Sequence, residues 1–417
     1  MKKFNRRTFL KVAAISVATL LTGCKHEENL PESLDVKFLR QIVTKDLAHS
    51  RCIMWQVEEP LNNPVVEVKT LRANDIKTFP AVDATFTDDG KKNFQYAAQI
   101  DDLAPDAAYE YRITDGGKVS AWQTLKTADG DKFTAIIFPD SQCGSDYKTW
   151  GNVASGAFKR NPDAKFFVNL GDLVDNGEDR SQWEDWLAQI KDFLPAIPLA
   201  PVMGNHETYS REWTVRPPVA YLNYFAPPDN GVENFSRRFY SFDYGAAHFV
   251  VLDTQWDELD GFTPGLIDAQ KNWLRQDLSA TAKPWKIVFL HKDVLQYRIK
   301  KRPERKEGFS DVGEIFMPEF DALGVDAVFT AHLHTYRNRG RLKNFSNDET
   351  GPLYILTGLS GNVRYSGLWV DHALDKVVAP QPETDNYLTL EVDDKTLTVK
   401  CFLANAKQID ETILHKA

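Results

Sequence analysis

Five apolar stretches of this chain end in side chains that suit metal chemistry. They are IIFPDSQ at 136–142, FFVNLGDLVDNG at 166–177, PVMGNHE at 201–207, IVFLHKD at 287–293 and VFTAHLH at 328–334. Carboxylate, amide and imidazole groups are the usual ligands of hard and borderline divalent cations. Because chemistry in an open α/β sheet gathers at the carboxyl ends of its strands, the five stretches predict a metal-dependent site.

The stretch 166–177 is the one around which we expect the others to be arranged. Its apolar run leads into Gly171 and then into Asp172 and Asp175. This pattern predicts a buried strand followed by a tight turn that exposes both carboxylates. Asp175 has a second interpretation, as a turn-capping carboxylate, since Asp is common in turns.

From Lys132 onward, apolar strands alternate with helical segments. Apolar residues recur at helical spacing in 183–193 and again in 269–278. The alternation predicts a layered α/β domain. The alternating segments that begin at Tyr387 and Thr396 predict an antiparallel hairpin that closes this domain.

The part of the chain before Lys132 has a different sequence pattern. Between Val36 and Ala128, short alternating segments are separated by turn residues, which predicts an all-β sandwich. This region shows no cluster of histidine, aspartate or cysteine. We interpret His49 as a solvated loop residue and Trp55 as a core anchor.

The length and the net charge of the chain limit the possible functions. A chain of 417 residues exceeds the usual size of a single core, so two domains are expected. The formal charge is -9, and removal of residues 1–23 with their five lysines and arginines gives -9 - 5 = -14. This acidic balance disfavours nucleic acid as a partner.

The N-terminus carries the features of an export signal. Arg6 and Arg7 resemble a twin-arginine signal, and the apolar segment 12–21 is too short to span a bilayer comfortably. The sequence LTGC at 21–24 resembles a bacterial lipobox, which implies lipidation of Cys24. We therefore expect a signal peptide at 1–24, a tether at 25–34 and a membrane-anchored lipoprotein in the periplasm or on the cell surface. A signal anchor or a chance apolar segment is the alternative.

Lipidation would leave an odd number of other cysteines: Cys52, Cys143 and Cys401. A disulfide framework is not expected, although one bridge stays open. Cys143 follows Gln142, but no motif supplies the base or cation that a nucleophilic thiol requires. His248, in the apolar segment 245–253, is interpreted as a satisfied core residue.

The order and spacing of the five motifs resemble those of the calcineurin-like metallophosphoesterases over residues 132–417. The segments 103–112 and 120–128, together with Trp55, resemble the fibronectin type III-like N-terminal domain of purple acid phosphatases. The resemblance implies a small all-β sandwich at 35–128. It also implies a four-layer α/β/β/α metallophosphoesterase domain at 131–417.

The resemblance further implies two metal ions, from among Fe, Mn and Zn. One is expected to bind Asp140, Gln142, Asp172 and His334, and the other Asp172 as a bridge with Asn205, His291 and His332. Most of the family has histidine where Gln142 stands, so Gln142 is either a weaker, neutral ligand or a side chain that only bonds nearby backbone. Purple acid phosphatases have an iron-binding tyrosine where Asp175 stands, so no purple colour is expected.

The implied reaction is hydrolysis of a phosphate monoester or diester by a metal-bound hydroxide. His206 would act as acid or charge stabiliser, and Asp175 would orient its ring through a hydrogen bond. The substrate-binding candidates are Arg337, Arg364 and Tyr336.

Two further questions stay open from the sequence. The basic run 298–306 is either a solvated loop or a rim that attracts anionic substrate. The alternative function is a cell-envelope lipoprotein that uses the retained fold to bind a ligand or partner.

Overall fold

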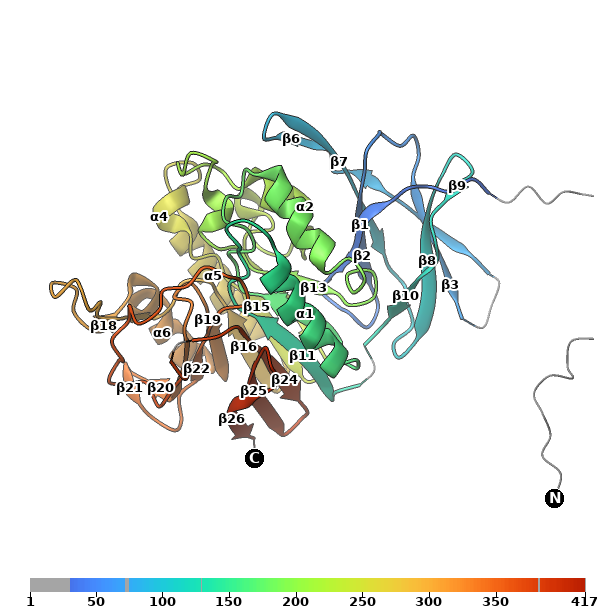
Figure 1. Ribbon diagram of the computed structural model, residues 1–417. Coiled ribbons are helices and arrows are strands. Elements are labelled where there is room, and N and C mark those ends of the chain that lie inside the picture. Colours follow the sequence, from blue (N-terminus) through green and yellow to red (C-terminus); the bar gives the residue numbers. More distant parts are fainter. Residues whose placement is uncertain (1–30, 72–74, 129, 382, 417) are drawn as a thin grey trace, which may run out of the picture.

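The computed structural model describes residues 31–71, 75–128, 130–381 and 383–416. Figure 1 shows the N-terminal strands gathered at one end of the molecule and the layers of helices and sheets at the other. Arg6, Arg7 and Cys24 lie outside the described residues. No helix in the described part of the chain is long and apolar enough to cross a membrane.

The first sheet of the α/β part has a parallel centre and an antiparallel edge. Its parallel strands are β11 (Phe133–Phe138), β12 (Phe166–Asn169) and β13 (Leu199–Pro201). The antiparallel edge consists of β24 (Asn386–Val392), β25 (Thr396–Leu403) and β26 (Gln408–His415). The predicted hairpin is thus confirmed as β24 and β25, whereas β26 was not anticipated.

The second sheet lies opposite the first. Its parallel strands are β15 (Ala247–Val251), β16 (Trp285–Phe289), β19 (Ala327–Thr330) and β22 (Leu353–Thr357). The antiparallel flanking strands are β14 (Tyr240–Tyr244), β20 (Tyr336–Lys343), β21 (Ser346–Asn347) and β23 (Val377–Val378).

The core lies between the two sheets, and helices cover their outer faces. Aromatic rings from both sheets meet in the centre, where the ring centroids of Phe166 and Phe249 are 5.2 Å apart. The helices are α1 (Lys148–Arg160) and α2 (Arg180–Gln189) on the first sheet, and α5 (Leu266–Ala280) and α6 (Asp311–Leu323) on the second. The predicted four-layer arrangement is confirmed. The helix expected over 183–193 starts at Arg180 and ends at Gln189.

Short elements connect these layers. They are the 3-10 helices at His206–Thr208 and Glu233–Phe235, the helices α3 (Val219–Tyr224) and α4 (Trp256–Leu259), and the strands β17 (Leu295–Gln296) and β18 (Gly308–Phe309).

The N-terminal part is a β-sandwich, as predicted, and Trp55 is fully buried in its core. The final residues of the expected tether are part of it, because the Leu34 N–H donates to the Val119 carbonyl at 2.8 Å. One layer is formed by β1 (Lys37–Ile42), β2 (Arg51–Val57), β5 (Val82–Asp83), β6 (Phe86–Asp88) and β7 (Lys91–Ile100). The other is formed by β3 (Val65–Thr70), β4 (Lys77–Pro80), β8 (Ala108–Asp115), β9 (Lys118–Val119) and β10 (Gln123–Lys126).

The sandwich and the α/β part share one sheet. Strand β1 pairs in parallel with β13 through Ile42 and Leu199, which makes a continuous 11-stranded sheet. The buried guanidinium of Arg40 reinforces this junction by donating to the Tyr224 carbonyl at 2.9 and 2.7 Å. The two parts are therefore joined by backbone pairing and buried hydrogen bonds as well as by their linker.

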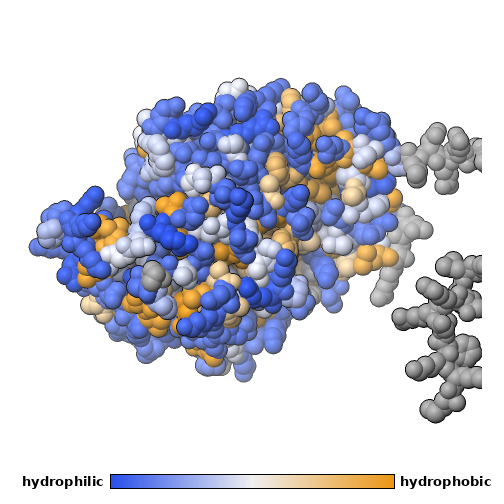
Figure 2. Space-filling model, viewed as in Figure 1, coloured by the Kyte–Doolittle hydropathy of each residue, from blue (hydrophilic) through white to orange (hydrophobic). Residues whose placement is uncertain are grey.

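The isolated polar and thiol groups are placed as the sequence predicts. His248 is buried and bonded on both ring nitrogens, to Asp243 and Asp277. Cys52, Cys143 and Cys401 are buried and unpaired, so the described residues form no disulfide. Hydrophilic residues cover most of the face shown in Figure 2, and hydrophobic residues gather there in separate patches.

Candidate metal centre

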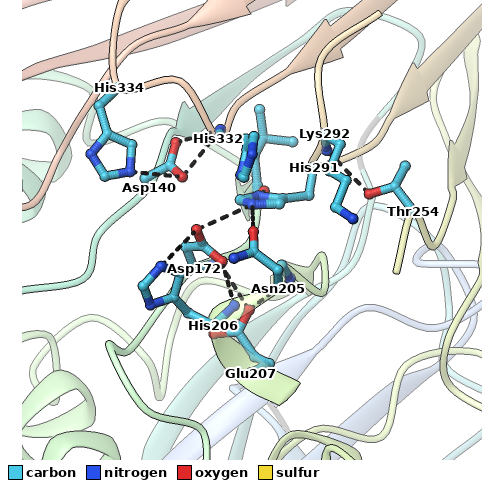
Figure 3. A network of polar contacts seen from close by, with 12 residues as sticks. Asp140, Asp172, Asn205, His206, Glu207, Thr254, His291, Lys292, His332 and His334 are labelled. Atoms are coloured by element: carbon cyan, nitrogen blue, oxygen red, sulfur yellow. Dashed lines mark hydrogen bonds and ion pairs between the residues drawn. The ribbon is translucent and has the colours of Figure 1, made fainter. Parts of the chain in front are cut away.

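The carboxyl ends of strands from both sheets converge on one site (Figure 3). Strands β11, β12 and β13 lead into it from the first sheet, and β16 and β19 from the second. The seven predicted ligands that follow these strands are Asp140, Gln142, Asp172, Asn205, His291, His332 and His334. The parallel order of the strands thus brings together residues that lie almost two hundred positions apart in the sequence.

The first cluster contains Asp140, Asp172 and His334, whose ligand atoms lie within 4.8 Å of one another. His334 Nδ1 donates to the Val363 carbonyl at 2.5 Å. Its Nε2 therefore faces the cluster, 3.4 Å from Asp140 Oδ1. Such a backbone bond on the second ring nitrogen is the usual way to orient a metal-binding histidine.

The second cluster contains Asp172, His291 and His332, again with ligand atoms within 4.8 Å of one another. His291 Nδ1 donates to the Leu170 carbonyl at 2.8 Å, and its Nε2 lies 3.2 Å from Asp172 Oδ2. Asn205 Oδ1 lies 3.1 Å from the same Nε2. The two clusters share Asp172, as the resemblance to the metallophosphoesterases implies.

Unpartnered polar atoms test whether cations fit this site. Both amide atoms of Gln142 are buried, and neither has a hydrogen-bond partner among the described residues. The same holds for Nδ1 of His332 within the described part of the chain. A buried polar atom without a partner is costly, so a ligand is the expected occupant. Carboxylate, amide and imidazole atoms in this number suit two divalent or trivalent ions.

The backbone at the site is strained and closely packed. Asp172, His332 and His334 adopt φ angles of 49°, 76° and 53°, in the left-handed region that non-glycine residues rarely adopt. A Cβ on Gly204 would lie 2.2 Å from Asp172 Oδ1, so only glycine fits there. Strain of this kind is characteristic of functional sites.

Burial and charge act against each other in the clusters. Burial disfavours a charge on Asp172, but His291 and His206 outweigh it and hold the pKa of Asp172 well below its ordinary value. Burial disfavours protonation of His291, yet Asp172 raises the pKa of that ring to about 9. Burial and the neighbouring His291 lower the pKa of His332 well below its ordinary value. Because imidazole ligands must be neutral, cation binding here would release protons.

His206 lies beside the clusters, with one ring nitrogen bonded to the backbone and the other facing Asp172. Its Nδ1 donates to the backbone carbonyl of Asp175 at 2.7 Å, so Nε2 is directed toward Asp172, 3.9 Å from Oδ2. The predicted hydrogen bond from the His206 ring to the Asp175 carboxylate is wrong, since the nearest carboxylate oxygen lies 3.9 Å from Nδ1. Asp175 therefore orients His206 through its main chain, and its carboxylate, whose pKa is raised by burial, contributes charge at a longer distance.

The side chains of the three predicted substrate-binding residues are already bonded to acidic residues. Tyr336 packs in the core between the sheets, with its hydroxyl donating to Asp410 at 2.6 Å, so its assignment is wrong. Arg337 is only 3% exposed; it lines a pocket with Lys300 and Tyr365, but its guanidinium is already paired with acidic residues. Those partners are Asp371, Asp375 and Glu383. Arg364 directly follows Val363, whose carbonyl accepts from His334, and is ion-paired with Asp385.

Two supporting residues were not singled out from the sequence. Glu207 is fully buried and accepts backbone hydrogen bonds around Asp172. Tyr209 accepts a bond from Asn205 Nδ2 at 3.3 Å, which leaves the amide oxygen of Asn205 facing His291. The signal for Glu207 was present in the GNHE motif, where an acid directly follows the ligand and the candidate acid. Cys143 is buried and its pKa is raised by that burial to about 11, so it is not a nucleophile.

Comparison with known proteins finds relatives of both parts of the chain. Residues 135–336 match the family model for calcineurin-like phosphoesterases, and residues 38–127 match the model for the N-terminal domain of purple acid phosphatases. Purple acid phosphatase 23 of Arabidopsis thaliana is 26% identical over 61% of this chain and 54% of its own length. Fe(3+)-Zn(2+) purple acid phosphatase 12 of the same plant is 24% identical over 68% of this chain and 61% of its own.

The chain thus spans somewhat over half the length of these two curated relatives. A solved structure of purple acid phosphatase PPD1 from yellow lupin seeds has the same fold, with a TM-score of 0.76 at 17% identity over 91% of this chain and 74% of that one. Residues 135–336 therefore form a domain of the calcineurin-like phosphoesterase type, and residues 38–127 form a domain of the purple acid phosphatase N-terminal type.

Proposed function

We propose that this protein is a dinuclear-metal-dependent hydrolase of phosphate monoesters or diesters. The observation that carries the proposal is the sharing of Asp172 by two clusters of ligand atoms. A carboxylate has two oxygens, so it can link two cations about 3.5–4 Å apart, as two-metal hydrolytic sites require. Two cations bound here would activate water and neutralise charge on the phosphoryl group.

Each residue of the site has a role in the proposed reaction. Asp140, Gln142 and His334 would complete the ligands of one cation, and Asn205, His291 and His332 those of the other. His206, with Nδ1 bonded to a carbonyl, has Nε2 free to hold a proton toward the leaving oxygen. A binding module on a retained fold has no need of a complete ligand set, so the intact clusters favour the hydrolase over that alternative.

The basic segment supports an anionic substrate. Arg298, Lys300, Lys301 and Arg302 are exposed. Lys300 lines a pocket together with Tyr365, whose ring stacks on the metal-binding candidate His334 at 4.6 Å. Of the four, Lys300 thus lies across one pocket from the ring that stacks on His334, where its charge would help to attract phosphate esters.

Metal analysis and turnover test this function together. The protein loaded with Fe, Mn or Zn is expected to hold two metals and to hydrolyse 4-nitrophenyl phosphate, bis(4-nitrophenyl) phosphate or both. Asp172→Asn should lose the bridge and nearly all turnover, whereas Asp185→Asn, at an exposed position, should behave as wild type. Two bound metals and near-normal turnover in the Asp172→Asn protein would contradict the proposal.

We also propose export by a twin-arginine signal and lipid anchoring at Cys24. The support is the sequence around Arg6, Arg7 and Cys24 alone. Changing both arginines to lysine should retain the protein in the cytoplasm, and Cys24→Ser should release it from membranes after export. Unchanged fractionation of both variants would refute this localisation.

A further inference from the structure

The loop that follows the candidate acid His206 displays an exposed tryptophan beside it. Trp213 is 58% exposed, and its ring centroid lies 5.7 Å from that of His206. Tyr209 completes the group, with its ring 5.4 Å from His206 and 6.0 Å from Trp213. A single exposed apolar residue is ordinary, but here aromatic rings extend from the reaction centre outward to solvent.

The backbone holds Trp213 in this position at a cost. Its φ of 61° lies in the left-handed region, where a bulky residue is strained. The Trp213 N–H donates to the Ser210 carbonyl at 3.0 Å, and the Ser210 N–H donates to the Thr214 carbonyl at 2.8 Å. A bridge between Tyr209 and Val215 closes the turn. The tight loop 209–215 therefore fixes the tryptophan at its tip before any ligand binds.

The position of this loop relative to the clusters indicates what it contacts. Figure 3 shows His206 on the side of Asp172 away from His332. A group that receives a proton from His206 Nε2 lies next to the ring of His206, which Tyr209 and Trp213 contact on the solvent side. On the side of His334, Tyr365 is 40% exposed and stacks on that histidine. Aromatic rings thus border the site at both of these histidines.

We propose that Trp213 and Tyr209 form a leaving-group subsite for a planar aromatic ring, such as an aryl or nucleobase group carried by the phosphate ester. The inference rests on the proposed phosphoester hydrolysis. Aromatic side chains prefer ring partners in stacked or edge-to-face arrangements, beyond what their area alone contributes. A fixed, exposed indole therefore favours a flat ring over a saturated group of equal size.

A matched pair of non-hydrolysable ligands tests this preference without turnover. Benzylphosphonate and cyclohexylmethylphosphonate differ only in whether the six-membered ring is flat, and their binding to the metal-loaded protein is measured by calorimetry. The wild type should bind the benzyl compound about three- to tenfold more tightly. Trp213→Phe should keep most of that preference, and Trp213→Leu, which keeps the apolar bulk, should reduce it to within about twofold.

The controls separate this inference from the function on which it rests. Methylphosphonate has no ring, so the wild type and both Trp213 variants should bind it alike. Equal binding of the two ring compounds by a wild type that binds methylphosphonate would overturn the subsite and leave the hydrolase intact. An unchanged benzyl preference in Trp213→Leu would also overturn it. Failure of the metal-loaded wild type to bind methylphosphonate and to hydrolyse any ester would instead remove the proposed function.

Discussion

The carboxylate of Glu207 accepts a hydrogen bond at 2.9 Å from the backbone N–H of Asp172, the residue that both ligand clusters share. The same carboxylate accepts bonds from the N–H groups of Leu173 at 2.8 Å and Gly204 at 2.6 Å. Glu207 is fully buried, and burial together with Asp172 raises its pKa to about 7. It therefore holds the strained turn at Asp172 against the segment that carries Asn205 and His206.

Glu207→Gln is expected to weaken this turn. An amide keeps one acceptor but places an NH₂ group against backbone donors, which costs about 1–3 kcal/mol for a buried polar mismatch. Both the free energy of unfolding and the metal content should fall, as measured by denaturant titration and elemental analysis. Glu233→Gln, at an exposed position, should change neither. A Glu207→Gln protein of normal stability and full metal content would show that the carboxylate is dispensable.

Gln142 is expected to be a metal ligand. Because its buried amide atoms have no partner elsewhere in the described residues, removal of the side chain should affect metal affinity more than folding. Gln142→Ala should weaken one of two binding events by at least about tenfold, measured by metal titration. Gln142→His should strengthen binding of zinc-like ions and shift the pH profile of turnover. Indistinguishable affinities of the wild type and the Ala variant would mean that Gln142 does not bind metal.

The placement of the ligands was predictable because each one directly follows a short apolar strand. Parallel strands end at the same edge, so local pattern was enough to bring Asp140 and Asp172 together. Side-chain direction near those ends was harder to predict. Tyr336 and Arg337 follow His334 closely, but they lie on strand β20, which directs one into the core and the other into an acidic network.

Contacts that depend on distant segments were missed for a different reason. The alternation of residues 36–128 predicted a sandwich, but the pairing of Ile42 with Leu199 joins two segments about 160 residues apart, and no local pattern encodes it. The hydrogen bond from His206 to the Asp175 carbonyl was also not predictable, because every residue has a backbone carbonyl and the sequence does not show which one is used. Trp213 carried no periodic signal, since it is exposed on a loop.

His248 should make stability depend on pH. Its ring nitrogens lie 2.7 Å from Asp243 and 2.8 Å from Asp277. Burial opposes protonation, but these carboxylates raise the pKa of His248 to about 9 from 6.5. A histidine whose pKa is higher in the folded state than in the unfolded state stabilises the folded protein when it is protonated. The contribution of His248 to the free energy of unfolding should therefore be complete below about pH 6.5 and lost as pH rises through about 9.

The His248→Gln variant tests this relation. It should be less stable than the wild type by roughly 1–3 kcal/mol near pH 6, because charge-assisted hydrogen bonds in a buried site are lost. The difference should shrink between about pH 6.5 and 9. Denaturant unfolding of both proteins across this range gives the measurement. A difference that stays constant with pH would show that His248 is neutral in the folded protein.

The N-terminal sandwich is expected to position the Trp213 loop. Arg216, three residues after Trp213, donates two hydrogen bonds to Asp88 at 2.6 and 3.0 Å, and Asp88 lies in the strand β6 of the sandwich. Asp88→Asn leaves the arginine without its charged partner and should loosen the loop. Benzylphosphonate binding should then weaken about threefold or more, because a loosened loop loses conformational entropy when the ligand orders it. Methylphosphonate binding should stay unchanged.

The matched comparison is the neighbouring pair in the same hairpin. Asp89 binds Arg211 at 2.9 Å, but the Arg211 side chain is 56% exposed, so Asp89→Asn should have little effect. Combining Asp88→Asn with Arg216→Gln should weaken benzylphosphonate binding no more than either change alone, because both remove the same interaction. Calorimetry of the wild type, the two single variants Asp88→Asn and Arg216→Gln, and the double variant measures this coupling. Additive losses, or equal losses for Asp88→Asn and Asp89→Asn, would show that the sandwich does not act on the subsite through this ion pair.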